Sequence, residues 1–162
     1  MATQKTGSRA QDAIALLKQD HKTMRELLAK LEEAEGRERK TTLKTIEHEL
    51  KVHTKIEEDI FYPAFREAAE KEDDNKLYFE ALEEHHVVDM VLPEIKDTDI
   101  DADEFPAKAK VLKDLVEHHA EEEETEMFPR AKKLMDRAQL MELGQQLADA
   151  KASLTGGAKT RR

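Results

Sequence analysis

Two copies of the motif His-x-x-x-Glu stand out in the chain because each can offer an imidazole and a carboxylate to one point. They are His53 with Glu57 and His119 with Glu123. Residues four apart lie on one face of an α-helix, so both groups of a pair can reach the same ion. Mixed nitrogen and oxygen donors suit iron or manganese, and zinc or copper also accepts them. The motif therefore indicates a metal site.

The two motifs belong to an internal repeat. Residues 53–63 and 119–129 share His, two Glu, an aromatic residue and Pro at equal offsets. Each segment follows one in which an acidic residue precedes a histidine, His21 in the first half and His85 in the second, with apolar residues at matching positions afterwards. We interpret this pattern as a duplicated helical hairpin that brings all four histidines inward.

Two histidine doublets leave a choice of residue. Neighbours in a helix are about 100° apart, so only one member of His85-His86 and one of His118-His119 can face the core. Apolar residues three and seven positions away favour His85 over His86 and His119 over His118. The other member of each doublet is then expected on the surface.

Further residues near the motifs have alternative interpretations. Asp89, four residues after His85, is either a ligand or a group beside a ligand. Tyr62 is expected as an aromatic plug like Phe128 in the other half, the alternative being a donor near the metal. Glu122 would replace Glu123 as a ligand if His118 pointed inward. Solvent exposure is expected for Asp20, Glu84 and His48.

The number of inward donors indicates two ions. Four histidines and two glutamates are too many for one tetrahedral zinc, and they suit a carboxylate-bridged pair within a helical bundle. The candidate ligands are His21, His53, Glu57, His85, His119 and Glu123. A bundle that binds no metal is the alternative, but buried carboxylates without partners are costly.

Long helices must position these side chains. Apolar residues spaced by three and four predict four long helices. The first starts near residue 10 and ends near Gly36, and the second runs from about Leu43 past Pro63, with a kink there. The third covers residues 79–97, and the fourth extends from residue 104 to Pro129. A short fifth piece follows around residues 140–147. Short polar links favour an all-α, up-down-up-down four-helix bundle. One domain is expected over 10–154, with disordered tails at 1–9 and 155–162.

Composition narrows the class of protein. The chain of 162 residues has a net charge of −10, with 40% charged and 38% hydrophobic residues, which suits amphipathic helices and argues against a nucleic-acid partner. Without Cys there are no disulfides or thiolate metal sites. No apolar run approaches the roughly 18 residues of a membrane span, and the N-terminus lacks a secretory apolar region. A soluble, cytoplasmic protein is expected.

The motifs together resemble the hemerythrin-like, or HHE cation-binding, domains. The resemblance covers about residues 10–135 and rests on two His-x-x-x-Glu-Glu motifs that each end in aromatic-Pro, each after a single inward histidine. It implies a four-helix bundle with two iron ions in an oxo- or hydroxo- and carboxylate-bridged non-haem centre that meets O2, peroxide or nitric oxide. The six candidate ligands named above match the ligand positions.

The sequence departs from the oxygen-carrying hemerythrins, whose third helix has His-x-x-x-His and whose fourth has His-x-x-x-x-Asp. Here these helices have His85-x-x-x-Asp89 and His119-x-x-x-Glu123. More oxygen donors favour ferric iron, which indicates peroxide decomposition in oxidative or nitrosative stress protection over O2 carriage. The alternative is an iron- or oxygen-binding module that senses or stores without turnover.

The expected partners follow from this chemistry. The ligand would be a small diatomic molecule or a peroxide. The chain lacks a Gly-rich nucleotide-binding loop, so electrons would come from the substrate or from an electron-donor protein. The pattern does not indicate an oligomeric state.

Overall fold

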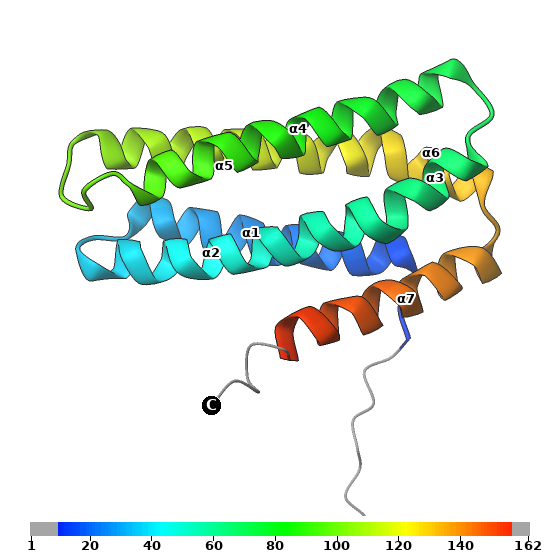
Figure 1. Ribbon diagram of the computed structural model, residues 1–162, viewed down its shortest axis with the longest axis horizontal. Coiled ribbons are helices and arrows are strands. Elements are labelled where there is room, and N and C mark those ends of the chain that lie inside the picture. Colours follow the sequence, from blue (N-terminus) through cyan, green and yellow to red (C-terminus); the bar gives the residue numbers. More distant parts are fainter. Residues whose placement is uncertain (1–9, 157–162) are drawn as a thin grey trace, which may run out of the picture.

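The computed structural model describes residues 10–156, whose regular secondary structure is all helical, with no strand (Figure 1). Five continuous helical rods account for them. The rods are α1 (Ala13–Glu33), α2 (Arg37–Ile56) with η1 (Glu57–Phe61) and α3 (Tyr62–Ala68), α4 (Glu72–Lys96), α5 (Glu104–Glu122) with η2 (Glu123–Met127) and α6 (Phe128–Leu134), and α7 (Arg137–Gly156). The all-helical class predicted from the sequence is confirmed.

The first four rods pack in two pairs. α1 lies beside α2, α4 lies beside α5, and α1 also contacts α5 (Figure 1). The link between α1 and α2 is short and contains Gly36, whose φ of 55° lies in the region that favours glycine. The chain can therefore reverse sharply after α1, which sets the first pair of helices side by side.

The rods that contain Pro63 and Pro129 each include a π-helical turn just before that proline, where the sequence predicted a simple kink at Pro63. Pro63 and Pro129 have no N–H to donate, and each stands just after such a turn. The N–H of the residue before each proline reaches back five residues, from Tyr62 to the Glu57 carbonyl and from Phe128 to the Glu123 carbonyl. Each rod thus continues past its proline with one wider turn.

The fifth rod is longer than the short piece expected from the sequence. α7 has 20 residues, extends past the expected boundary at 154, and packs against α1 and α2. A Cβ at Gly144 would lie 2.1 Å from the Gln11 carbonyl oxygen, so glycine allows α7 to approach the start of α1. The tails expected over 1–9 and 155–162 lie outside the described residues, except that residues 155–156 belong to α7.

The core consists of two apolar clusters with a polar layer between them. Leu17 of α1 belongs to the first cluster and Met24 to the second, and His21 lies between the two along the helix. On α2, Leu50 belongs to the second cluster and Ile56 to the first. On α4 and on the rod that begins with α5, the residues on one side of the buried histidine likewise belong to one cluster and those on the other side to the other. Apolar side chains therefore enclose the polar layer on both sides.

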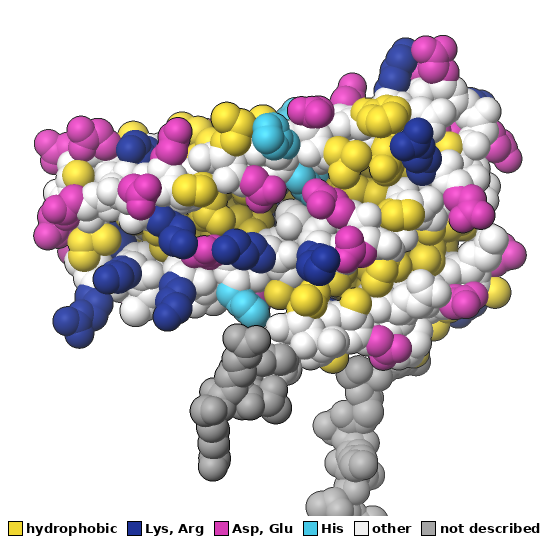
Figure 2. Space-filling view, in the orientation of Figure 1, with side chains coloured by type: hydrophobic (Ala, Val, Ile, Leu, Met, Phe, Trp, Pro, Cys, Tyr) yellow, Lys and Arg dark blue, Asp and Glu magenta, His cyan; other side chains and the backbone are white. Residues whose placement is uncertain are grey.

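Charged side chains of both signs are interspersed over the face shown in Figure 2, with hydrophobic side chains between them. Exposed large hydrophobic residues include Phe79 and Met90. Among residues 10–156, no helix has both the length and the apolar character needed to cross a membrane.

Candidate metal centre

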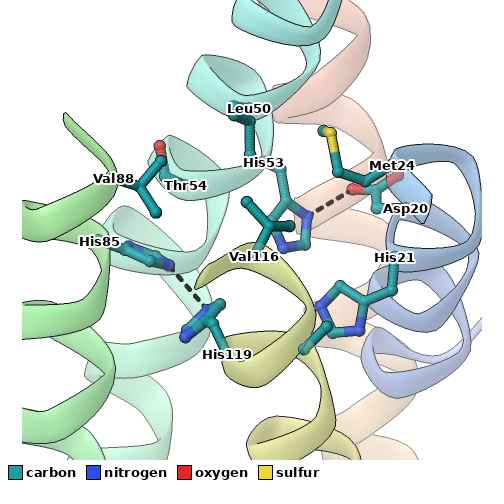
Figure 3. Close-up of a pocket in the computed structure, with 11 residues that line it drawn as sticks. Asp20, His21, Met24, Leu50, His53, Thr54, His85, Val88, Val116 and His119 are labelled. Carbon is teal, nitrogen blue, oxygen red and sulfur yellow. Dashed lines mark hydrogen bonds and ion pairs between the residues drawn. The ribbon is translucent and has the colours of Figure 1, made fainter. Parts of the chain in front are cut away.

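All six residues predicted as ligands lie in the polar layer. Their exposed fractions are between 0% and 7%. Figure 3 shows the four imidazoles pointing toward one another from α1, α2, α4 and α5. The two glutamates are the first residues of the π-helical turns, Glu57 in η1 and Glu123 in η2. Four rods therefore supply one buried cluster of nitrogen and oxygen donors.

The donors divide into two groups, and within each group the ligand atoms all lie within 4.8 Å of one another. The groups are His21, His53 and Glu123, and Glu57, His85 and His119. Glu57 reaches beyond its own group, because its Oε1 lies 2.5 Å from His53 Nε2 and 3.6 Å from His85 Nε2. One carboxylate thus stands between histidines of different groups.

Glu123 is placed in the same way in the second repeat. Its Oε1 lies 3.2 Å from His21 Nε2 and 3.1 Å from His119 Nε2. Both glutamates therefore contact histidines from both groups. This is the arrangement in which carboxylates can bridge two ions.

Three of the four imidazoles have a further carboxylate within hydrogen-bond distance of the outer nitrogen, Nδ1, and the fourth, His21, has Glu124 Oε1 3.7 Å from its Nδ1. The distances are 3.0 Å from His53 to Asp20, 2.9 Å from His85 to Glu58 and 2.9 Å from His119 to Glu84. An Nδ1–H that donates to a carboxylate leaves the Nε2 lone pair facing the layer. The expectation that Asp20 stays in solvent is wrong, because Asp20 is buried against His53. Glu84 is partly exposed, and one of its oxygens reaches His119 on a neighbouring helix.

The donors of the layer suit a bound cation. His53 Nε2 and both carboxylate oxygens of Glu57 are buried and make no well-formed hydrogen bond, although His53 Nε2 and Glu57 Oε1 lie 2.5 Å apart. Burial opposes the charged form of His53, but the charge of Glu57 and the hydrogen bond that His53 donates to Asp20 raise the pKa of His53 to about 10. Buried charges without partners are costly, and a metal ion would meet these donors together. Imidazole nitrogen and carboxylate oxygen without sulfur suit iron or manganese.

Tyr62 belongs to the same layer, although the sequence favoured an aromatic plug. Its hydroxyl lies 3.1 Å from His85 Nε2 and 3.3 Å from His119 Nε2, and it donates to Glu123 Oε2 at 3.2 Å. Burial and the charge of Glu123 raise the pKa of Tyr62 well above its ordinary value. In the metal-free protein the phenol therefore keeps its proton.

The π-helical turn explains why the sequence pattern did not place Tyr62 here. Nine residues separate it from His53, which in a regular α-helix corresponds to opposite faces at about 100° per residue. The wider turn of η1 brings Tyr62 back toward the layer. In the second repeat Phe128 has the matching position, and its ring stacks on His21 with centroids 5.8 Å apart. Only one half of the site therefore has a phenol oxygen.

A cavity of about 20 Å³ borders the layer, with room for a water-sized molecule. All four buried imidazoles line it, together with apolar side chains such as Leu50, Val88 and Val116 (Figure 3). A small ligand in this space would lie beside the candidate metal positions.

The alternative residues lie on the surface. His48, His86 and Asp89 are exposed, and the His118 side chain is 71% exposed and pairs with Glu122. Asp89 is therefore not available as the additional oxygen donor that the sequence suggested on the third helix. The additional oxygen near the buried histidines is that of Tyr62.

Comparisons with known proteins identify the family of this chain. A family described as "Hemerythrin HHE cation binding domain" matches residues 12–131. The crystal structure of a hemerythrin HHE cation binding domain-containing protein from Mycobacterium kansasii is similar, with a TM-score of 0.80 and 30% identity over 91% of this chain and 90% of that chain. No curated protein matches the sequence. Since the family match spans most of the chain and contains both halves of the repeat, this chain belongs to the hemerythrin HHE cation-binding domain family.

Proposed function

We propose that this chain is a non-haem di-iron protein that decomposes peroxide in oxidative or nitrosative stress protection, with O2 and nitric oxide as further ligands of the same site. The observation that carries the proposal is the pair of donor groups spanned by Glu57 and Glu123. Short links and the paired packing of α1 with α2 and α4 with α5 support an up-down-up-down four-helix bundle around it.

Each residue of the layer has a role in this proposal. One ion would be held by His21 and His53, the other by His85 and His119 with the oxygen of Tyr62, and Glu57 and Glu123 would bridge them. An iron pair supplies Lewis acidity and two one-electron redox couples next to the cavity. The protein's part is to hold the donors still and to keep larger molecules out of a cavity of about 20 Å³.

The surrounding carboxylates favour ferric iron. Asp20, Glu58 and Glu84 accept hydrogen bonds from Nδ1 atoms and so make the Nε2 atoms more basic. Carboxylate and phenol oxygens are hard donors that stabilise the higher charge. This setting disfavours reversible O2 carriage. Disproportionation of two hydrogen peroxide molecules to O2 and two waters requires no outside reductant, so the substrate alone suffices.

Iron analysis and O2 release from hydrogen peroxide test the proposal together. Protein from iron-replete medium should contain about two iron atoms per chain and release O2 faster than free iron does. Glu57→Gln should abolish the release, whereas Glu49→Gln, elsewhere on α2, should not. One tetrahedral zinc and no iron would contradict the di-iron proposal. Bound iron that is inert toward peroxide would favour storage or sensing.

A further inference from the structure

A third His-x-x-x-Glu pair lies on the outside of α5, one residue out of step with the buried pair. His118 Nε2 lies 3.6 Å from Glu122 Oε2 on its own helix and 3.3 Å from Glu84 Oε2 on α4. Ligand atoms of these three residues all lie within 4.8 Å of one another. The outer cluster thus offers one imidazole and two carboxylates, the same kinds of donor as the buried layer, but open to solvent.

The surroundings of the outer cluster are acidic. A hollow of about 500 Å³ beside it is lined by Phe79, Glu80, Glu83 and the three cluster residues. An adjoining hollow of about 200 Å³ adds Glu121, Thr125 and Glu126. Six glutamates with a single histidine and no lysine or arginine line the two hollows, so the local field attracts cations.

The outer cluster is connected to the buried layer by Glu84. Its Oε2 faces His118, and its Oε1 lies 2.9 Å from His119 Nδ1. A separate void of about 10 Å³ between α4 and η2 is lined by Glu84, Glu122 and the buried candidate ligand Glu123, and by the apolar side chains of Leu77, Ala81 and Met127. An ion at the outer cluster would therefore be separated from the buried donors by one side chain and a small void.

We propose that Glu84, His118 and Glu122 form a surface site for a divalent cation, from which the ion passes to the buried centre. Three protein donors leave several coordination positions to water, which suits an ion that binds and moves on. Fe²⁺ is the ion to be passed inward, and this part rests on the proposed di-iron function. The surface site itself depends only on the three residues named.

Mn²⁺ binding to the iron-loaded protein tests the surface site. Electron paramagnetic resonance of free Mn²⁺ should show one additional bound ion per chain, with affinity more than about tenfold weaker in the double variant His118→Ala/Glu122→Gln. A matched control, His48→Ala/Glu26→Gln, makes the same changes at exposed positions on α2 and α1. Equal Mn²⁺ binding by the two double variants would overturn the proposal.

Iron uptake tests the passage inward. Metal-free protein mixed with Fe²⁺ should fill the centre about tenfold more slowly in the His118→Ala/Glu122→Gln variant, and both variants should reach the iron content of the parent. Equal uptake rates would overturn the role in passage. A parent protein that takes up no iron, while still binding Mn²⁺ at the surface, would instead contradict the proposed function. The single variant His118→Ala should also slow the uptake. It leaves Glu122 unchanged, so its effect cannot come from a change next to the candidate ligand Glu123.

Discussion

His85 and His86 are neighbours in the sequence with opposite environments. His85 is 2% exposed and its Nδ1 contacts Glu58, whereas His86 is exposed on α4. A helix turns by about 100° per residue, so the two imidazoles cannot share a face. Replacing each of the two histidines in turn therefore tests the assignment of His85 as a ligand, with His86 as the control.

Replacing His85 with Ala should deplete iron, while His86→Ala should leave the iron content unchanged. Loss of a ligand weakens metal binding by more than about tenfold, since even groups behind the ligands contribute tenfold or more. Metal analysis of the two variants, purified in parallel, is the measurement. Equal iron contents would remove His85 from the ligand set.

Tyr62→Phe isolates the contribution of one oxygen atom. The second repeat has Phe128 at the matching position, so the ring alone should pack, and stability should change by no more than about 1 kcal/mol. Iron should remain bound, but the visible absorption of a ferric–phenolate contact should disappear. Tyr78→Phe is the control, since that ring packs against Tyr62 with centroids 6.3 Å apart. Identical spectra of the two variants would show that the Tyr62 oxygen does not touch iron.

At the scale of the helix, regular periodicity explains what the sequence could predict. The apolar stripe of a regular α-helix identified His85 and His119 as buried, because the helices are unbroken up to those residues. The same pattern did not place Tyr62 correctly, because Tyr62 follows a π-helical turn, where the helix departs from 3.6 residues per turn. It also did not predict the histidine contacts of Asp20 and Glu84, whose partners lie on other helices and so depend on packing rather than on local spacing.

Asp74 connects two elements near the same end of the molecule. It accepts hydrogen bonds from the backbone N–H groups of Glu70 and Lys71 at the start of α4, and it pairs with Arg130 of α6. The hydrogen bond from Arg130 lowers the pKa of Asp74 to about 2. Because the folded-state pKa is below the ordinary value of 3.8, the stabilisation is present above about pH 4 and is lost as pH falls toward 2.

Asp74→Asn should therefore lower the free energy of unfolding at pH 7 by about 2 kcal/mol, and the difference from the parent should shrink toward zero near pH 2. Urea unfolding across this pH range measures both effects. Asp73→Asn, at an adjacent side chain that is 85% exposed, should change little. A difference that persisted at pH 2 would mean that the carboxylate charge is not the cause.

For the molecule as a whole, the buried layer is a break in an otherwise apolar interior. The two apolar clusters close it from both sides, and α7 adds a contact from outside, where Lys151 pairs with Asp20 behind His53. Glu57 has no exposed surface, and its carboxylate faces the imidazoles of His53 and His85. A metal ion that binds these buried donors binds only the folded protein, so metal binding and stability should be coupled.

Removing iron with a chelator should lower the melting temperature. A ligand present at a thousand times its dissociation constant contributes about 4 kcal/mol to stability. Glu57→Leu, which lacks the buried charge and a bridging donor, should show little change on chelation. Calorimetry of both proteins with and without chelator is the measurement, and an unchanged melting temperature of the parent would mean that these side chains are not metal ligands.

The matching positions of Tyr62 and Phe128 bear on how the site fills. Duplication of a hairpin would by itself give two interchangeable half-sites, and a protein with one metal ion per chain would then be a mixture of two forms. The Tyr62 oxygen, which lies beside His85 and His119 while a phenyl ring lies beside His21, makes the two halves different. Half-loaded protein is therefore expected to be one chemical species, to which a second, different metal can be added in a defined order.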